Sequence, residues 1–150
     1  MVSEFPNLHP LLPRRSLLEP NEDSRMLHLL TMDDGGQPRT IAQSQFSVNE
    51  WHVLIPLLQA YPGYASYETL LTALTGTPFV LSRKRLDDAR RTKTIRQELR
   101  AIRDALSNVG EKLVAFGFTY ASIYERGYTL ALLSPQGDEE IRDSTSSSVM

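Results

Sequence analysis

One apolar stripe constrains the fold of this chain more than any other feature of its sequence. Between Thr94 and about Ala115, large apolar residues recur at intervals of four, three, four, three and four: Ile95, Leu99, Ile102, Leu106, Val109 and Leu113. At about 100° per residue, these side chains fall on one face of a helix. The pattern predicts a long helix with one buried side, and Gly110 should weaken its last turns.

The edge of this helix beside the apolar stripe is basic. Five residues fall about 80–160° away from the stripe, and they are Lys93, Arg96, Arg100, Arg103 and Ser107. Residues 83–103 contain nine basic and three acidic residues, a net charge of +6, whereas the whole chain carries −2, which leaves −8 for the rest. Concentrated positive charge on an otherwise acidic molecule is typical of a protein that binds a polyanion. The alternative interpretation is a basic helix face that only contacts water.

Three shorter helices are predicted ahead of the long one. Ser47 and Glu50 form a capping box, so the first helix should begin at Ser47 and end at Pro62-Gly63. Its expected buried residues are Trp51, Leu54, Ile55 and Leu58. A second helix should run from a Ser66 cap to Gly76, and a short basic helix should begin at Ser82.

Strand patterns lie on both sides of these helices. Residues 25–32 and 39–46 flank a Gly-rich turn, which predicts two paired strands. Residues 119–133 are β-branched and aromatic at both ends, with a charged centre at Glu125 and Arg126, which predicts a hairpin. Three tyrosines alternate along it. Tyr120 and Tyr128 are expected to cover the helices, whereas Tyr124 can stack on a sugar or a base.

Neither end of the chain shows the regular spacing of apolar residues that marks a helix or a strand with one buried face. Residues 1–24 contain four prolines, so we expect a flexible Pro-rich arm there. Residues 134–150 are acidic and Ser-rich, so we expect a flexible tail. At 150 residues a single domain is the default. The folded domain should therefore lie at residues 25–133.

With the short basic helix set aside as an insertion, the order of these elements is that of a winged helix-turn-helix, an α+β fold. It consists of a small N-terminal antiparallel sheet, a three-helix core with a long third helix, and a C-terminal β-hairpin wing. In that fold the third helix enters the major groove of DNA. The hairpin at the end of this chain then corresponds to the wing, which touches the adjacent DNA backbone.

The chain resembles the DNA-binding effector domain of two-component response regulators of the OmpR/PhoB type. Four motifs within roughly residues 25–133 carry the resemblance: Phe46–Trp51, Pro62–Leu71, Lys112-Leu113 followed by Gly117, and Tyr124–Leu130. The family's receiver domain is absent from this sequence. A basic insertion at residues 82–93 separates the second helix from the recognition helix. Tyr124 and Glu125 replace the family's usual Arg and Gly in the wing.

The resemblance implies a sequence-specific DNA-binding transcriptional regulator. In a gap-free register, the family's base- and phosphate-contacting positions become Arg100, Arg103, Ala105, Ser107, Asn108 and Gly110. With the basic edge and the wing, the expected DNA-binding residues are Lys93, Arg96, Arg100, Arg103, Ser107, Asn108, Tyr124 and Arg126. The expected partner is double-stranded DNA. RNA polymerase or another regulator, and a second copy in a homodimer, are further candidate partners.

A protein-binding winged helix that does not bind DNA is the alternative function. Only two of the six register positions are basic, and the net charge is −2. No enzyme is predicted, because no catalytic triad or phosphate-binding loop can be placed. There is no Cys, and His9, His28 and His52 lack metal-ligand spacing, so we expect neither metal nor cofactor. No signal peptide and no run of about 20 apolar residues is present. We therefore expect a soluble cytoplasmic protein without membrane contact.

Overall fold

The computed structural model describes residues 5–133 and is an α+β protein. Its strands are β1 (Ser16–Asn21), β2 (Met26–Met32), β3 (Pro38–Gln45), β4 (Ala65–Ser66), β5 (Phe118–Ile123) and β6 (Gly127–Leu132). Its helices are α1 (Val48–Ala60), α2 (Tyr67–Thr75), α3 (Phe79–Arg91), α4 (Ile95–Glu98) and α5 (Arg100–Leu113), with 3-10 turns η1 (Pro6–Leu11) and η2 (Val114–Phe116). The predicted tail, 134–150, lies outside the described residues. Within residues 5–133, none of the helices is both long enough and apolar enough to cross a lipid bilayer.

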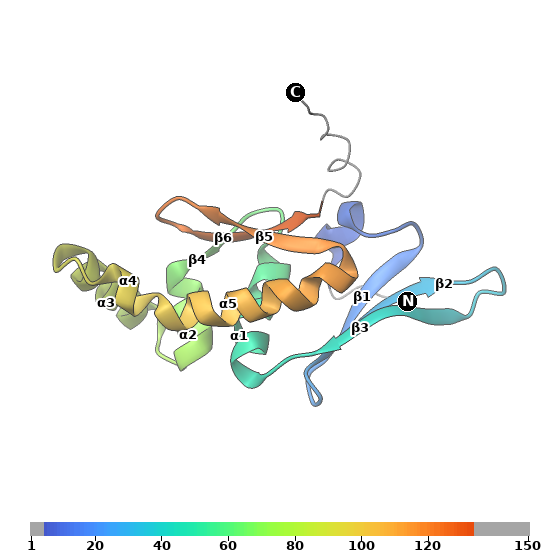
Figure 1. The fold of residues 1–150 in the computed structure, drawn as a ribbon, viewed down its shortest axis with the longest axis horizontal. Coiled ribbons are helices and arrows are strands. Elements are labelled where there is room, and N and C mark those ends of the chain that lie inside the picture. The colour runs from blue at the N-terminus through green and yellow to red at the C-terminus, as the bar shows by residue number, and fades with distance from the viewer. Residues whose placement is uncertain (1–4, 134–150) are drawn as a thin grey trace, which may run out of the picture.

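The strands form two small antiparallel sheets, with the orders β1-β2-β3 and β4-β6-β5. Figure 1 shows the first sheet at one end of the molecule and α3 and α4 at the other end. Helix α5 runs along the molecule between these two ends, and the β5–β6 hairpin lies beside it. The hairpin tip therefore lies at the same end of the molecule as α3 and α4.

Residues 5–24 belong to the folded domain, which corrects the prediction of a flexible arm over 1–24. Strand β1 pairs with β2 along its whole length. Two leucines of this segment are buried in the core, Leu8 and Leu18. Two of the prolines, Pro6 and Pro20, lie where no backbone donor is needed. Pro6 begins η1, and Pro20 lies in β1, which is an edge strand.

Helices α1 and α2 begin and end close to the predicted residues. The Ser47 hydroxyl accepts a hydrogen bond from the Glu50 amide at 3.2 Å, and the Glu50 carboxylate accepts one from the Ser47 amide at 2.9 Å. This is the predicted capping box. Ser66 caps α2 by accepting a bond from the Thr69 amide at 3.1 Å. Gly76 ends α2 in the left-handed conformation, with φ of 76°.

The basic helix α3 begins at Phe79, three residues earlier than the predicted start at Ser82. Pro78 stands directly before the first helical residue. The buried face of α3 consists of Ser82, Leu86 and Ala89. The hydroxyls of Ser82 and Thr72 are hydrogen-bonded at 2.8 Å, which joins α3 to α2. Ser82 therefore fixes α3 against α2 and does not cap it.

The predicted long helix consists of two pieces, α4 and α5, which are separated at Leu99. The backbone of Leu99 has φ of −90° and ψ of −2°, outside the usual α-helical values. The buried stripe itself is confirmed, because Ile95 is partly buried and the other members are buried: Leu99, Ile102, Leu106, Val109 and Leu113. A hydrophobic period does not detect the break, since the apolar side chains stay on the buried side across it.

Two glycines allow the hairpin to pack closely on its neighbours. A Cβ on Gly110 of α5 would lie 2.7 Å from Cε1 of Tyr120. A Cβ on Gly127 would lie 2.0 Å from the Ala65 carbonyl oxygen, at the point where β4 pairs with β6. Tyr128 is buried, and its ring centre lies 5.8 Å from that of Tyr120. These two tyrosines cover the helices as predicted.

Candidate nucleic-acid interface

A salt bridge near the C-terminal end of α5 fixes this helix relative to α1. Lys112 Nζ donates hydrogen bonds to Glu50 Oε1 at 2.7 Å and to the Gln45 carbonyl oxygen at 2.8 Å. Burial alone would raise the pKa of Glu50. Hydrogen bonds from Lys112 and from the Ser47 amide outweigh burial, so the pKa of Glu50 is lowered. Glu50 is therefore a carboxylate at neutral pH, and the ion pair holds the end of α5 in place.

The predicted basic edge lies on the solvent side of α4 and α5. Arg96, Arg100 and Arg103 are exposed, and they line a shallow depression of about 270 Å³ together with Gln97 and Asp104. No ion pair within residues 5–133 involves any of the three arginines. Their charge is therefore available to an anion from solution.

Several other basic residues of this region are already neutralised by acidic neighbours. Arg85 of α3 pairs with Glu98 of α4, and Arg91 pairs with Asp88 one turn earlier. These ion pairs reduce the number of positively charged side chains of residues 83–103 that are available to a ligand. Counting ion pairs among residues 5–133, the three arginines of the α4–α5 edge are thus the basic residues of these two helices that remain unpaired.

A groove beside the hairpin tip brings together predicted residues that are distant in sequence. This tip groove has a volume of about 570 Å³ and is lined by Tyr67, Arg90, Lys93, Ile95, Arg96, Leu99, Ser122, Tyr124 and Glu125. Lys93 and Arg96 thus line the same groove as Tyr124, which is 82% exposed at the hairpin tip. Burial raises the pKa of Tyr67 in the wall of the groove, so its hydroxyl stays neutral and can donate a hydrogen bond.

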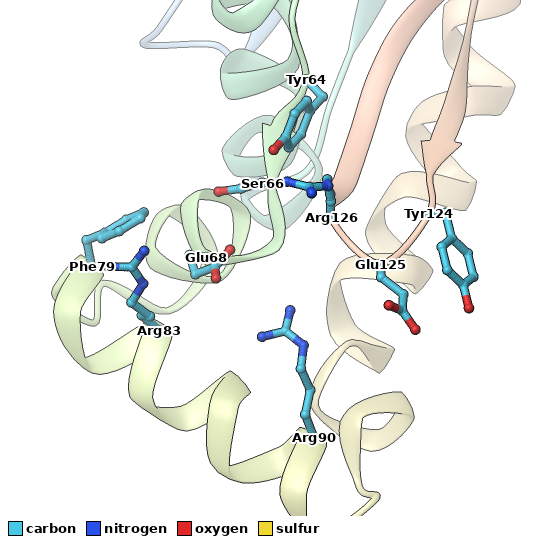
Figure 2. Close-up of a pocket in the computed structure, with 9 residues that line it drawn as sticks. All are labelled: Tyr64, Ser66, Glu68, Phe79, Arg83, Arg90, Tyr124, Glu125 and Arg126. Atoms are coloured by element: carbon cyan, nitrogen blue, oxygen red, sulfur yellow. The ribbon is translucent and has the colours of Figure 1, made fainter.

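A second groove lies on the other side of the hairpin tip, between the tip, α3 and β4. This α3 groove has a volume of about 490 Å³ and is lined by Tyr64, Ser66, Glu68, Phe79, Arg83, Arg90, Tyr124, Glu125 and Arg126. Figure 2 shows Arg90 extending from α3 into the space that faces the hairpin tip, whereas Arg83 lies beside Phe79, and Glu68 lies between α3 and Arg126. Arg126, a predicted wing residue, therefore belongs to this second groove.

The remaining predicted residues lie farther along α5. Ser107 and Asn108 are exposed but line neither of the two grooves nor the arginine depression. Ala105, a contact position in the family register, is buried, and Gly110 faces the ring of Tyr120. The structure therefore corrects the register prediction at both positions. Both lie on the packed side of α5, where Ala105 is buried and Gly110 is partly buried.

Arg83 and Arg90 were not among the predicted site residues, although both line grooves at the hairpin tip. The signal that could have found them is the basic run over residues 83–91. That run gives the charge but not the direction of each side chain. The direction follows from the buried face of α3, which is set by its packing on α2.

The chemistry that this surface offers is that of exposed hydrogen-bond donors with positive charge. Among residues 5–133, no three histidine, aspartate or glutamate side chains gather closely enough to hold a metal ion. The arginines, in contrast, offer several N–H donors in the fork geometry that matches phosphate and carboxylate. Comparisons of the chain with protein-family models, with curated proteins and with solved structures found no match.

Proposed function

We propose that this chain is a winged-helix, sequence-specific DNA-binding transcriptional regulator. In this arrangement α5 enters the major groove, and the β5–β6 hairpin is the wing. The order of the elements supports the proposal, because a small sheet, packed helices and a terminal hairpin follow one another along the chain. The basic edge of α4 and α5 also lies at the same end of the molecule as the hairpin tip.

The observation that carries the proposal is the tip groove. It joins Lys93 and Arg96, which form no ion pair within residues 5–133, to Tyr124 on the hairpin, and Arg96 also lines the depression with Arg100 and Arg103. Basic residues of α3, of α4 and of the loop between them thereby form one connected surface with the exposed Tyr124 of the hairpin. Such a surface suits a duplex, whose phosphates flank the groove that the helix enters.

The dimensions of α5 suit the major groove. A helix of 14 residues is about 21 Å long, and a major groove about 12 Å wide admits it. Arg100 and Arg103 are three residues apart and lie on one side of the helix, so both can reach guanine edges. Lys93, Arg96 and Arg126 then contact phosphates. Farther along α5, the polar side chains of Ser107 and Asn108 can hydrogen-bond to base edges.

A winged helix that binds protein instead of DNA is the second candidate. It is favoured by the acidic residues Asp104 and Glu111, which are exposed on α5. It is also favoured by the inward position of Ala105 and Gly110, which leaves fewer residues of α5 to contact DNA than the family register implies. Acidic side chains on a recognition helix repel phosphates and accept hydrogen bonds from protein donors.

A gel shift with mixed-sequence duplex DNA at low salt tests the proposal. We expect retarded complexes that weaken steeply as salt rises, together with retention on heparin, because phosphate contacts release counterions. No shift and no retention would favour the protein-binding candidate. A genome-wide pull-down of bound DNA then tests sequence specificity: enrichment of one motif supports a regulator, whereas uniform recovery indicates binding to the backbone alone.

A further inference from the structure

The charges of the α3 groove match a polypeptide better than they match a DNA backbone. Arg83 and Arg126 make no ion pair within residues 5–133, and Arg90 pairs with Asp87 of its own helix at 3.1 Å. Two carboxylates, those of Glu68 and Glu125, line the same groove. A continuous row of phosphates would be repelled by both carboxylates. A segment that carries charges of both signs can pair with both kinds of side chain.

The α3 side of this groove consists of Phe79, Arg83 and Arg90, and the first turn of α3 is apolar and exposed. Phe79, Val80 and Leu81 form the first turn of α3 and are 45%, 73% and 53% exposed. Phe79 lines the groove, and the lining also includes two exposed tyrosines but no lysine. Aromatic and arginine side chains without lysine are typical of the centre of protein–protein interfaces. The groove is therefore suited to an occupant with an apolar anchor.

The chain itself contains a segment of the complementary composition. Residues 138–143 have the sequence Asp-Glu-Glu-Ile-Arg-Asp, in which three consecutive acidic residues precede an apolar residue and a basic one. The arginines of the groove suit the acidic residues, and its two carboxylates suit the single arginine of the segment, Arg142. The exposed ring of Phe79 suits Ile141. The kinds of side chain in this segment thus complement the kinds of side chain that line the groove.

The segment is also long enough to reach the groove. Strand β6 leaves the hairpin tip at Gly127, and the described chain ends six residues later at Leu133, about 20 Å away along the strand. The eight residues from Leu133 to Ile141 span at most about 26–29 Å when extended. An extended segment from Leu133 can therefore return along the hairpin to the level of its tip, with about two residues left to enter the groove.

We propose that residues 138–143 bind in the α3 groove of their own chain. The acidic residues pair with Arg83 and Arg126, and Ile141 covers Phe79. Because the tether is short, the effective concentration of the segment at the groove is in the millimolar range, so weak intrinsic affinity suffices. Bound there, the segment occupies Arg126 at the hairpin tip and competes with any other anion for it. The proposal does not require that the protein bind DNA.

Disulfide trapping in the full chain tests this proposal, because the natural sequence has no cysteine. The test variant carries Phe79→Cys and Ile141→Cys, and the rate of disulfide formation in dilute protein is followed on non-reducing gels. A disulfide requires the two Cα atoms to approach within about 7 Å. The control variant adds Asp138→Asn, Glu139→Gln and Glu140→Gln, which keeps the length of the tether and removes the acidic charges.

We expect an intramolecular disulfide that forms about tenfold faster in the test variant than in the control variant at low salt. High salt should remove most of this difference, because it screens exposed charges. Equal rates in the two variants would show random collision of the ends and would overturn the proposal. Disulfides between two molecules would overturn it in favour of a second copy as occupant. Should Phe79→Cys disturb the fold by circular dichroism, Tyr64→Cys on the opposite wall gives the same comparison.

Discussion

Replacing Glu50 by glutamine removes the ion pair that fixes α5 while nearly preserving shape. The Glu50 carboxylate accepts hydrogen bonds from Lys112 Nζ and from the Ser47 amide, and the residue is buried. A hydrogen bond to a charged group contributes about 1.5–3 kcal/mol. The Lys112 side chain is partly exposed and can turn to water, and glutamine keeps one acceptor oxygen for the cap. We therefore expect Glu50→Gln to lower the free energy of unfolding by about 1–2 kcal/mol.

Urea denaturation followed by the fluorescence of the single tryptophan, Trp51, measures this loss. Glu111→Gln is the matched control, because Glu111 is an exposed glutamate of α5 that forms no ion pair within residues 5–133. It should change the free energy of unfolding by less than about 0.5 kcal/mol. Equal losses for Glu50→Gln and Glu111→Gln would refute the role assigned to the ion pair.

The pH dependence of this loss gives an independent check. The pKa of Glu50 is lowered from its ordinary value of 4.5 in the folded protein. The stabilisation is therefore fully present above that ordinary value and is lost as pH falls through the lower, folded-state pKa. The difference between the parent protein and Glu50→Gln should shrink between neutral pH and about pH 3. A difference that stays constant over this range would contradict the assignment.

Three further perturbations test the packing. Leu106→Ala should lower the free energy of unfolding by about 2–5 kcal/mol in chemical denaturation, because Leu106 is fully buried at the centre of the stripe. A loss below about 0.5 kcal/mol would mean that this face is not packed. Gly127→Ala should cost about 1–3 kcal/mol in thermal unfolding, since its Cβ would meet the Ala65 carbonyl, and an unchanged melting temperature would contradict that contact. Deleting residues 1–24 should lower the free energy of unfolding by about 3–6 kcal/mol, because the segment contains two buried leucines. A deletion that leaves urea denaturation unchanged would restore the interpretation of this segment as a flexible arm.

Local signals in the sequence predicted the elements that depend on neighbouring residues. The capping box at Ser47, the cap at Ser66 and the stop at Gly76 each use contacts within three or four residues. The apolar stripe of α5 depends on helix geometry alone. These features are therefore visible without knowledge of the fold. The same holds for the β5–β6 hairpin, which pairs residues on either side of a short turn.

Features set by tertiary packing were not predicted. The N-terminal segment lacks a period of its own, and β1 forms because β2 supplies a pairing partner. Serine is a residue type that often caps helices, but the packing of α3 on α2 places Ser82 in the interior. Similarly, Ala105 follows the family register in sequence yet faces the core. Arg83 meets Arg126 in one groove only because the hairpin tip lies beside α3.

The salt dependence of DNA binding by a triple variant tests the central claim most directly. Arg96→Ala, Arg100→Ala and Arg103→Ala together remove the unpaired edge of α4 and α5. The matched control replaces three exposed arginines near the N-terminal sheet, and these are Arg14, Arg15 and Arg39. Both variants lose three positive charges, so only the position of the charge differs between them.

Binding to a mixed-sequence duplex of about three helical turns is measured over a range of salt concentrations for both variants. We expect the α4–α5 variant to bind more weakly than the parent, with a slope of log affinity against log salt that is shallower by about two to three. The control variant should keep a slope close to that of the parent. An α4–α5 variant that binds with the parent's affinity and slope would contradict the claim that this edge contacts DNA.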